Sequence, residues 1–171
     1  MLKLCGLFLI CGISVYGGMA LTVSERKRVA QLRGFLSVFT RAQTETERMR
    51  LPLAEILSGC TEESLSKNGF LPLLRKKMAE TPLCGQAFAK AIREAGDTGM
   101  LILDTEDSKA LISYVSPLGT EDGETTLRRL AYATETLRKR VADAERGLSD
   151  TVRIIRTLSV SVGVLAVILF I

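Results

Sequence analysis

Apolar residues recur at alternating steps of three and four over the last third of the chain, from Thr120 to Ile171. This spacing is that of a narrow apolar seam on a straight helix, and charged residues occupy the other faces. From Leu158 onward the chain carries no charge. The pattern predicts one long helix that begins in water and ends in a membrane. The seam consists of Leu127, Leu130, Thr134, Leu137, Val141, Ala144, Leu148, Val152 and Ile155.

The beginning of the chain shows the same pattern in reverse order. Leu4 to Val23 is free of charge, and about 20 such residues suffice to cross a bilayer as a helix. Apolar positions then continue at helical spacing along one face, with polar residues on the other. We expect this helix to leave the membrane and to lie antiparallel beside the last helix. The apolar positions are Val29, Leu32, Phe35, Leu36, Val38, Phe39 and Ala42.

Proline and glycine divide the middle of the chain into short helical segments. No alternating strand pattern is present, and Thr120 is the predicted N-cap of the last helix. The expected fold is therefore all-α: a six-helix bundle flanked by N- and C-terminal transmembrane helices, with long antiparallel first and last helices. The short helices are predicted from Pro52 to Gly59, from near Pro72, from Ala87 to a stop at Gly96, and from Asp104 or Thr105 to before Pro117.

Basic residues beside the two apolar segments set the expected orientation. Only Lys3 precedes the first segment, whereas Arg26, Lys27, Arg28 and Arg33 follow it, and Arg153 and Arg156 precede the second. Because basic residues in short flanks stay on the cytoplasmic side, both segments predict a cytoplasmic bundle. The expected domains are an N-terminal anchor at residues 1–23, the helical bundle at 24–156 and a C-terminal membrane segment at 157–171.

The first apolar segment has an alternative interpretation as a cleaved signal peptide. The small-x-small pattern at residues 18–20 resembles a cleavage site. The basic residues that follow favour a retained anchor instead. Small residues four apart, Ser14 with Gly18 and Ser159 with Gly163, would let the membrane helices pack closely.

The composition argues against catalysis. The chain has no histidine, which removes the commonest general base and the commonest metal ligand. It has four cysteines, and no two of them have the C-x-x-C spacing of a zinc site. A disulfide between Cys60 and Cys84 is conceivable, but a reducing compartment favours free thiols. The sequence contains no phosphate loop, nucleophile elbow or dinucleotide fingerprint.

The charged clusters have two interpretations each. Carboxylates at 62–63, 104–107 and 121–124 could bind a cation, but each group precedes or opens a predicted helix, where acidic residues act as caps. Basic runs at 75–77 and 138–140 could meet nucleic acid, but aromatic residues for base stacking are few. We therefore expect caps and solvated helix faces, with no catalytic residue, metal, cofactor, nucleic acid or small-molecule substrate.

The segment from Ser116 to Glu124 predicts a turn. Pro117 ends one helix, Gly119 supplies an unusual backbone angle and Thr120 begins the next helix. The same acidic turn would lie at the membrane-distal tip of the bundle, where it could contact a partner.

Two short motifs and the C-terminal tail carry a family resemblance. Glu45 with the segment 51–55 is similar to the pattern E-I-x-Y-x-x-T-P-L-x-E-A, and the turn at 118–122 is similar to L-G-x-S-D. The apolar tail at 158–171 is similar to L-G-V-L-x-G. In this order, between two apolar ends, they resemble the stage III sporulation protein AB family of endospore-forming bacteria. The resemblance covers nearly the whole chain.

The resemblance implies an assembly role without catalysis. Family members are similar to the cytoplasmic domain of the type II secretion inner-membrane platform protein, a six-helix bundle. They belong to the secretion-like channel complex between mother cell and forespore that endospore formation requires. The implied partners are membrane lipids, the secretion-type ATPase stage III sporulation protein AA and other stage III sporulation channel proteins. The implied location is the mother-cell membrane, with the bundle in the cytoplasm, and the implied partner-binding residues are Glu45, Pro52, Glu55, Gly119 and Asp122.

Two other hypotheses stay open on the sequence alone. The chain could be an exported or membrane-anchored helical protein of another secretion-type complex, and mass spectrometry of the mature N-terminus would detect a cleaved segment. It could also be a membrane-associated enzyme, which would require a cleft with carboxylates of perturbed pKa.

Overall fold

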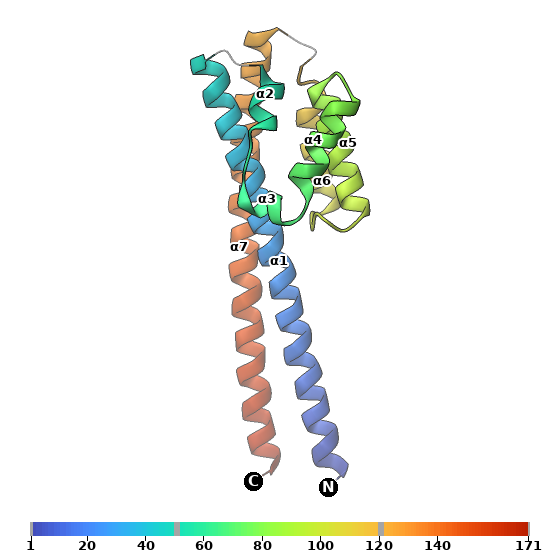
Figure 1. Ribbon diagram of the computed structural model, residues 1–171. Coiled ribbons are helices and arrows are strands. Elements are labelled where there is room, and N and C mark those ends of the chain that lie inside the picture. The colour runs from blue at the N-terminus through green and yellow to red at the C-terminus, as the bar shows by residue number, and fades with distance from the viewer. Residues whose placement is uncertain (1, 50–51, 120–121, 171) are drawn as a thin grey trace. The chain divides into compact units, whose positions relative to one another are not determined.

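The computed structural model of the chain consists of helices and short connections (Figure 1). It describes the backbone of residues 2–49, 52–119 and 122–170, and within them the side chains of 22–49, 52–119, 122–155, 157, 158 and 161. No strand occurs in these ranges, so the all-α prediction is confirmed. The helices are α1 (Leu2–Met49), α2 (Leu53–Ser58), α3 (Glu63–Lys67), α4 (Phe70–Glu80), α5 (Cys84–Asp97), α6 (Thr105–Val115) and α7 (Gly123–Phe170).

The chain divides into two compact units. The bundle unit comprises residues 28–141 and contains α2 to α6 with the adjoining parts of α1 and α7. The arm unit comprises residues 1–27 and 142–171, the outer parts of the two long helices. Within the bundle unit α1 and α7 run in opposite directions, as predicted (Figure 1).

The structure describes seven helices where the sequence predicts six. The additional helix is α3, whose five residues contain a single buried apolar residue, Leu65, and therefore give no periodic pattern. The predicted end of α5 at Gly96 is wrong, because Gly96 lies inside the helix and the left-handed Gly99, with a φ of 72°, follows its end. The predicted end of α2 at Gly59 is confirmed.

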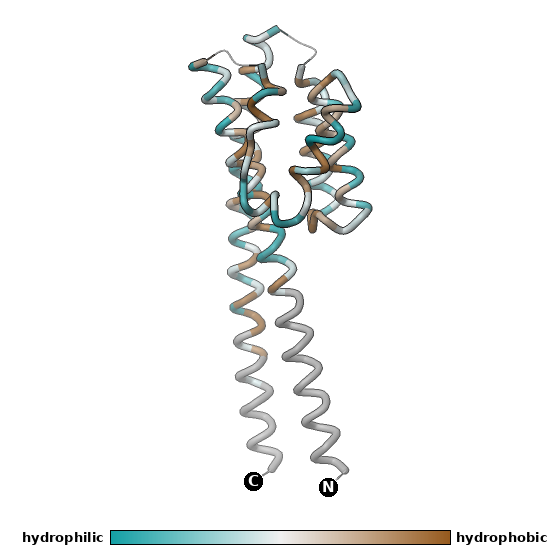
Figure 2. Tube along the Cα trace, in the orientation of Figure 1, coloured by the Kyte–Doolittle hydropathy of each residue, from teal (hydrophilic) through white to brown (hydrophobic). Residues whose placement is uncertain are grey.

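The long helices bury the predicted apolar faces within the bundle unit, but five of the nine predicted seam positions of α7 are only half-buried: Leu127, Ala144, Leu148, Val152 and Ile155. Along each helix of the bundle unit, hydrophobic and hydrophilic positions alternate in short steps (Figure 2). This burial removes apolar area from water, the main favourable contribution to folding. The buried positions of α1 are Val29, Leu32, Phe35, Val38, Phe39 and Ala42, and those of α7 include Leu130, Thr134, Leu137 and Val141.

Four phenylalanine rings form the centre of the core. Phe35 and Phe39 come from α1, Phe70 from α4 and Phe88 from α5. The centroid of Phe35 lies 5.2 Å from that of Phe70 in an edge-to-face arrangement, and Phe88 lies 5.7 to 6.2 Å from the other three. Rings at these separations attract one another beyond the effect of area burial. The cluster therefore joins α1 to α4 and α5, which are distant from it in sequence.

Gly34 explains why α3 can lie against α1. A Cβ atom at Gly34 would stand 2.3 Å from the Oγ of Ser64 and 3.1 Å from the Cγ of Leu65. Real Cβ atoms do not approach so closely, so the two helices meet only because this position has no side chain. A local sequence pattern does not reveal this contact.

Thr134 has a buried hydroxyl group that makes no hydrogen bond. Its side chain is 5% exposed and its Oγ1 has no partner. An unpaired buried hydroxyl loses its hydrogen bonds to water on folding. We therefore expect Thr134→Val to raise the free energy of unfolding by about 1 kcal/mol, measured by chemical denaturation. Thr136→Val is the matched control, because the hydroxyl of Thr136 donates to the carbonyl oxygen of Tyr132 at 2.9 Å. A stabilising effect in both variants, or in neither, would contradict the explanation.

Among the residues whose side chains are described, no helix offers an apolar stretch long enough to cross a bilayer. The predicted membrane segments, 1–23 and 157–171, fall almost entirely outside those residues. So do the four small residues proposed to pack there, Ser14, Gly18, Ser159 and Gly163.

Candidate functional site

The five residues singled out by the resemblance lie at one end of the bundle unit. This is the end where α1 finishes, α2 begins and the turn between α6 and α7 is located (Figure 1). Glu45 is half-buried, and the other four are exposed. We call this end, defined by Glu45, Pro52, Glu55, Gly119 and Asp122, the distal end. Because the four residues other than Glu45 are exposed to solvent, their surface is available to a partner.

Glu45 forms an ion pair along α1. The Nε of Arg41 donates to its Oε1 at 2.6 Å, one helical turn away. This hydrogen bond raises the pKa of the Arg41 guanidinium above its ordinary value. The pair holds both side chains on the same face of α1.

That face of α1 borders a wide, shallow groove of about 540 Å³, whose described lining comes from α1 alone. A second hollow of about 260 Å³ shares Ser37 and Arg41 with it and reaches the connection between α2 and α3 at residues 60–63. Ser37 donates to the Oε2 of Glu62 at 3.0 Å, which fixes this connection against α1. The groove residues follow one another at helical spacing: Arg33, Leu36, Ser37, Thr40, Arg41, Thr44 and Glu45.

The turn between α6 and α7 has the backbone that the sequence predicts. Gly119 has a φ of 87°, the left-handed conformation that glycine adopts without strain. The predicted cap, Thr120, lies outside the described residues. Because α7 begins at Gly123, Asp122 occupies the capping position, and it accepts a hydrogen bond from the backbone N–H of Thr125 at 3.4 Å. Hydrogen bonding with Thr125 lowers the pKa of the Asp122 carboxyl.

The other acidic clusters follow the capping prediction only in part. Asp104 caps α6, accepting from the N–H of Thr105 at 2.6 Å. Glu62 precedes α3 but makes no capping hydrogen bond. Its carboxylate instead accepts a hydrogen bond from the hydroxyl group of Ser37. Asp107 lies in the first turn of α6, as predicted, but it is buried at 3% exposure and makes ion pairs instead of a cap.

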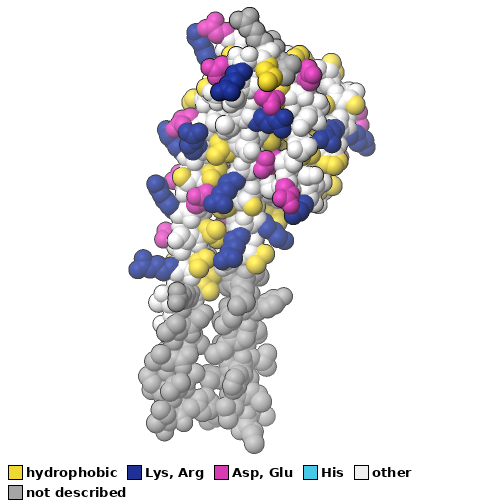
Figure 3. Space-filling view, turned by 60° about the vertical axis from the view of Figure 1, so that its left-hand side comes forward, with side chains coloured by type: hydrophobic (Ala, Val, Ile, Leu, Met, Phe, Trp, Pro, Cys, Tyr) yellow, Lys and Arg dark blue, Asp and Glu magenta, His cyan; other side chains and the backbone are white. Residues whose placement is uncertain are grey.

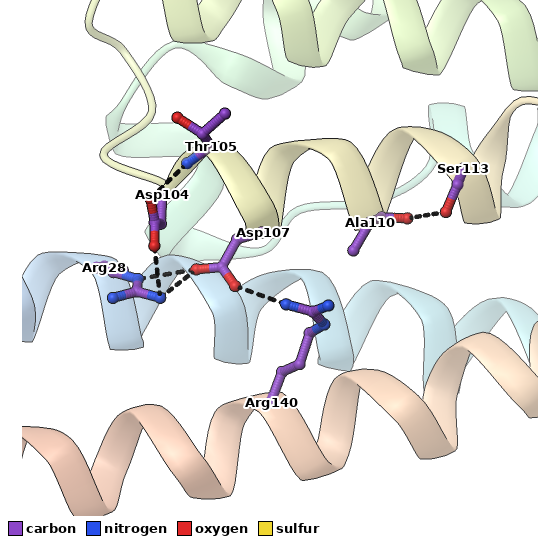
Figure 4. A network of polar contacts seen from close by, with 7 residues as sticks. All are labelled: Arg28, Asp104, Thr105, Asp107, Ala110, Ser113 and Arg140. Carbon is purple, nitrogen blue, oxygen red and sulfur yellow. Dashed lines mark hydrogen bonds and ion pairs between the residues drawn. The ribbon is translucent and has the colours of Figure 1, made fainter.

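Asp107 instead lies between two arginines (Figure 4). Its Oδ2 accepts from the Nε of Arg28 at 2.8 Å and contacts the Nη2 at 2.6 Å, and its Oδ1 accepts from the Nη1 of Arg140 at 3.3 Å. The sequence contained a signal for this burial. Asp107, Leu111 and Val115 are spaced by four and share the buried face of α6.

Some residues of the two basic runs make contacts within the chain. Arg75 donates to the carbonyl oxygens of Ser58 at 3.1 Å and Cys60 at 3.0 Å, which ties α4 to the end of α2. Lys77 pairs with Glu94 at 2.8 Å, and this hydrogen bond raises the pKa of Lys77. Over the surface seen in Figure 3, positive and negative side chains are interspersed. The prediction of solvated helix faces therefore holds for part of each run, while Arg75 and Arg140 have structural roles.

The two described cysteines, Cys60 and Cys84, are buried free thiols. Cys60 donates to the carbonyl oxygen of Ile56 and Cys84 to that of Leu118. Burial raises the pKa of both thiols, so that they remain protonated at neutral pH. Among the described residues, no cluster of side chains that could bind a metal ion occurs.

Comparison with known proteins gives one match. The family model described as Stage III sporulation protein AB matches residues 3–171. No curated protein and no solved structure matches the chain. The matched region includes both apolar ends, the bundle unit and all five residues of the distal end. The chain therefore belongs to the stage III sporulation protein AB family.

Proposed function

We propose that this chain is a non-catalytic membrane platform that docks a partner through the distal end of its helical bundle. The observation that carries the proposal is the gathering of Glu45, Pro52, Glu55, Gly119 and Asp122 at one end of the bundle unit (Figure 1). They come from three separate parts of the sequence. Besides the turn role of Gly119 and the capping role of Asp122, their common exposure at one end lets these residues belong to a single contact surface.

The α1 groove extends the proposed docking surface. Glu45 belongs both to the distal end and to the groove, which runs back along α1 to Arg33. A partner segment lying in it would meet hydroxyl groups, a leucine side chain and the Arg41–Glu45 ion pair. Such a mixture of apolar and polar contacts is typical of non-obligate interfaces.

The family suggests the partner and the location. We propose that the distal end binds the secretion-type ATPase stage III sporulation protein AA, within the channel complex between mother cell and forespore. The charge-free ends, Leu4–Val23 and Leu158–Ile171, would anchor the chain in the mother-cell membrane. Helices α1 and α7 run into these segments without interruption of their backbone, so they would connect the docking surface to the membrane.

Binding to this ATPase is the direct test. The full chain in lipid nanodiscs would be mixed with the purified ATPase and analysed by size-exclusion chromatography with light scattering. A defined complex supports the docking role and gives its stoichiometry. Absence of a complex at tens of micromolar would contradict it. Mass spectrometry of the mature N-terminus tests the anchor separately, since loss of residues 1–23 would show a cleaved signal peptide.

Charge reversal at the distal end should weaken this binding. We expect Glu55→Lys and Asp122→Lys each to raise the dissociation constant about tenfold, because charges at an interface guide association and oppose the wrong partner. Asp122→Asn separates the two roles of that residue, since asparagine keeps the N-cap and removes the charge. Asp97→Lys is the control, because Asp97 is exposed at the end of α5, away from the distal end.

Thermal melts followed by circular dichroism accompany these binding measurements. We expect the melting temperatures of the Glu55 and Asp122→Asn variants to stay close to that of the wild type. Equal weakening of binding by Asp97→Lys would show a general charge effect and would remove the distal end from the interface.

A further inference from the structure

One buried carboxylate joins the first and last long helices to the rest of the bundle. The side chain of Asp107 is 4% exposed, whereas those of Arg28 and Arg140 are 25% and 34% exposed. Each arginine takes a different oxygen of the carboxylate (Figure 4). Asp104, the N-cap residue of α6, also lies 3.9 Å from Arg28. Asp107 is thus a side chain of the first turn of α6 that contacts both α1 and α7.

Removing the Asp107 charge would do more than delete an attraction. Arg28 and Arg140 both lie within hydrogen-bonding distance of the same carboxylate, so their two positive charges are close together. With the negative charge between them they are held in place, and without it this carboxylate no longer offsets their mutual repulsion.

The network lies where both helices leave the bundle unit. Arg28 is the first residue of that unit, and Arg140 is next to its last residue, Val141. Beyond them α1 continues back to Leu2 and α7 onward to Phe170. Separation of α1 or α7 from α6 at this edge of the bundle unit must therefore break these contacts.

The connection between α5 and α6 provides a second attachment for α1, through the side chain of Gln31. The buried side chain of Gln31 donates to the carbonyl oxygen of Met100 at 3.4 Å and accepts from the N–H of Ile102 at 2.7 Å. This attachment is one turn from Arg28. On α7, in contrast, Arg140 is bound to the side chain of Asp107 itself. Release of Asp107 should therefore free α7 to a greater extent than α1.

We propose that Asp107 is a conformational latch: with both arginines bound it holds α1 and α7 together at the edge of the bundle unit, and without these contacts this part of the two helices is released from α6. Because α6 leads directly into the Gly119 turn, the latch connects this edge of the bundle unit to the element that ends at the distal end. The latch does not require the proposed docking function, and its test uses no partner.

Hydrogen–deuterium exchange of the full chain in lipid nanodiscs tests the latch. We expect Asp107→Asn, which keeps the shape and removes the charge, to speed amide exchange at least tenfold in residues 22–30 and 138–146. Exchange in α4 and α5 should stay within twofold of the wild type. Arg140→Gln alone should speed exchange in residues 138–146 and leave 22–30 nearly unchanged, because Arg28 keeps both contacts with Asp107.

The double variant Asp107→Asn/Arg140→Gln distinguishes a latch from an ordinary stabilising ion pair. Removing one of two repelling charges should slow exchange in residues 22–30 relative to Asp107→Asn alone. Asp104→Asn is the control, because asparagine still caps α6 and the contact with Arg28 is longer. Three outcomes would each overturn the proposal. Amide exchange in Asp107→Asn could be unchanged, it could increase equally in every helix, or the increases caused by the two single substitutions could simply add in the double variant.

Discussion

Replacing Phe88 by alanine should cause the largest loss of stability among truncations of the core. Phe88 is 2% exposed, and its ring packs against the rings of Phe35, Phe39 and Phe70 from two other helices. The substitution removes apolar contacts and leaves a cavity that a close-packed interior refills only in part, which costs about 3–5 kcal/mol. Chemical denaturation of the full chain in detergent, followed by circular dichroism, measures this loss.

Two further variants show whether the loss of stability comes from disrupting the phenylalanine cluster or merely from removing an aromatic ring. Phe88→Leu keeps much of the volume and should lose about half as much stability as the alanine variant. Tyr132→Ala removes an aromatic ring that is 67% exposed and has an edge-to-face contact with Tyr114, and should cost at most about 1 kcal/mol. A loss in Phe88→Ala no greater than in Tyr132→Ala would contradict the central position of this cluster.

The sequence predicted the parts of the fold that follow from long, regular patterns. The buried faces of α1 and α7 extend over many turns, so a period of three and four residues identifies them without knowledge of their neighbours. Asp104 and Gly59 mark helix ends through local backbone chemistry, and the structure places them there. These features depend only on residues close together in the chain.

Features that depend on distant residues were predicted wrongly or not at all. The apolar pattern of α3 is too short to be recognised, and its position depends on the absence of a side chain at Gly34. Acidic residues favour first turns, and Asp107 does lie in the first turn of α6, but its spacing from Leu111 and Val115 places it on the buried face. Its charge is tolerated there only because Arg28 and Arg140 approach from other helices.

The candidate site also depends on residues that are distant in the sequence. Its five residues were chosen from a family resemblance, and nothing in their local spacing predicted that they would meet at one end of the bundle unit. The α1 groove also depends on tertiary structure, because Ser37 and Arg41 line it together with the connection at 60–63. From sequence alone, the stripe from Arg33 to Glu45 is only a polar helix face.

Gly85→Ala should be nearly as harmful as the loss of Phe88, for the opposite reason. A Cβ atom at Gly85 would stand 2.3 Å from the carbonyl oxygens of both Val115 and Leu118, and 3.0 Å from the N–H nitrogen of Leu118. These are backbone atoms, which cannot turn aside as a flexible side chain can. We expect the free energy of unfolding to fall by about 3 kcal/mol, the upper end of the usual cost of overpacking.

The same helix supplies the control for this prediction. Gly96 lies inside α5, and a Cβ atom there would meet nothing within 4 Å. Since alanine favours a helix more than glycine does, Gly96→Ala should stabilise the protein by about 0.5–1 kcal/mol. Similar stability changes in the two variants, measured by the same denaturation experiment, would show that the close approach at Gly85 is not a constraint.

Gly85 also tests whether the core positions the distal end. Its N–H donates to the carbonyl oxygen of Leu118 at 3.1 Å, so the first turn of α5 supports the backbone immediately before Gly119. An alanine side chain must push this backbone away, and the turn that carries Asp122 would move with it. We therefore expect folded Gly85→Ala protein to bind the candidate ATPase at least as weakly as Asp122→Lys, whereas Gly96→Ala binds normally. Normal binding by folded Gly85→Ala protein would mean that the turn is not part of the docking surface, and the α1 groove would then be the part to test.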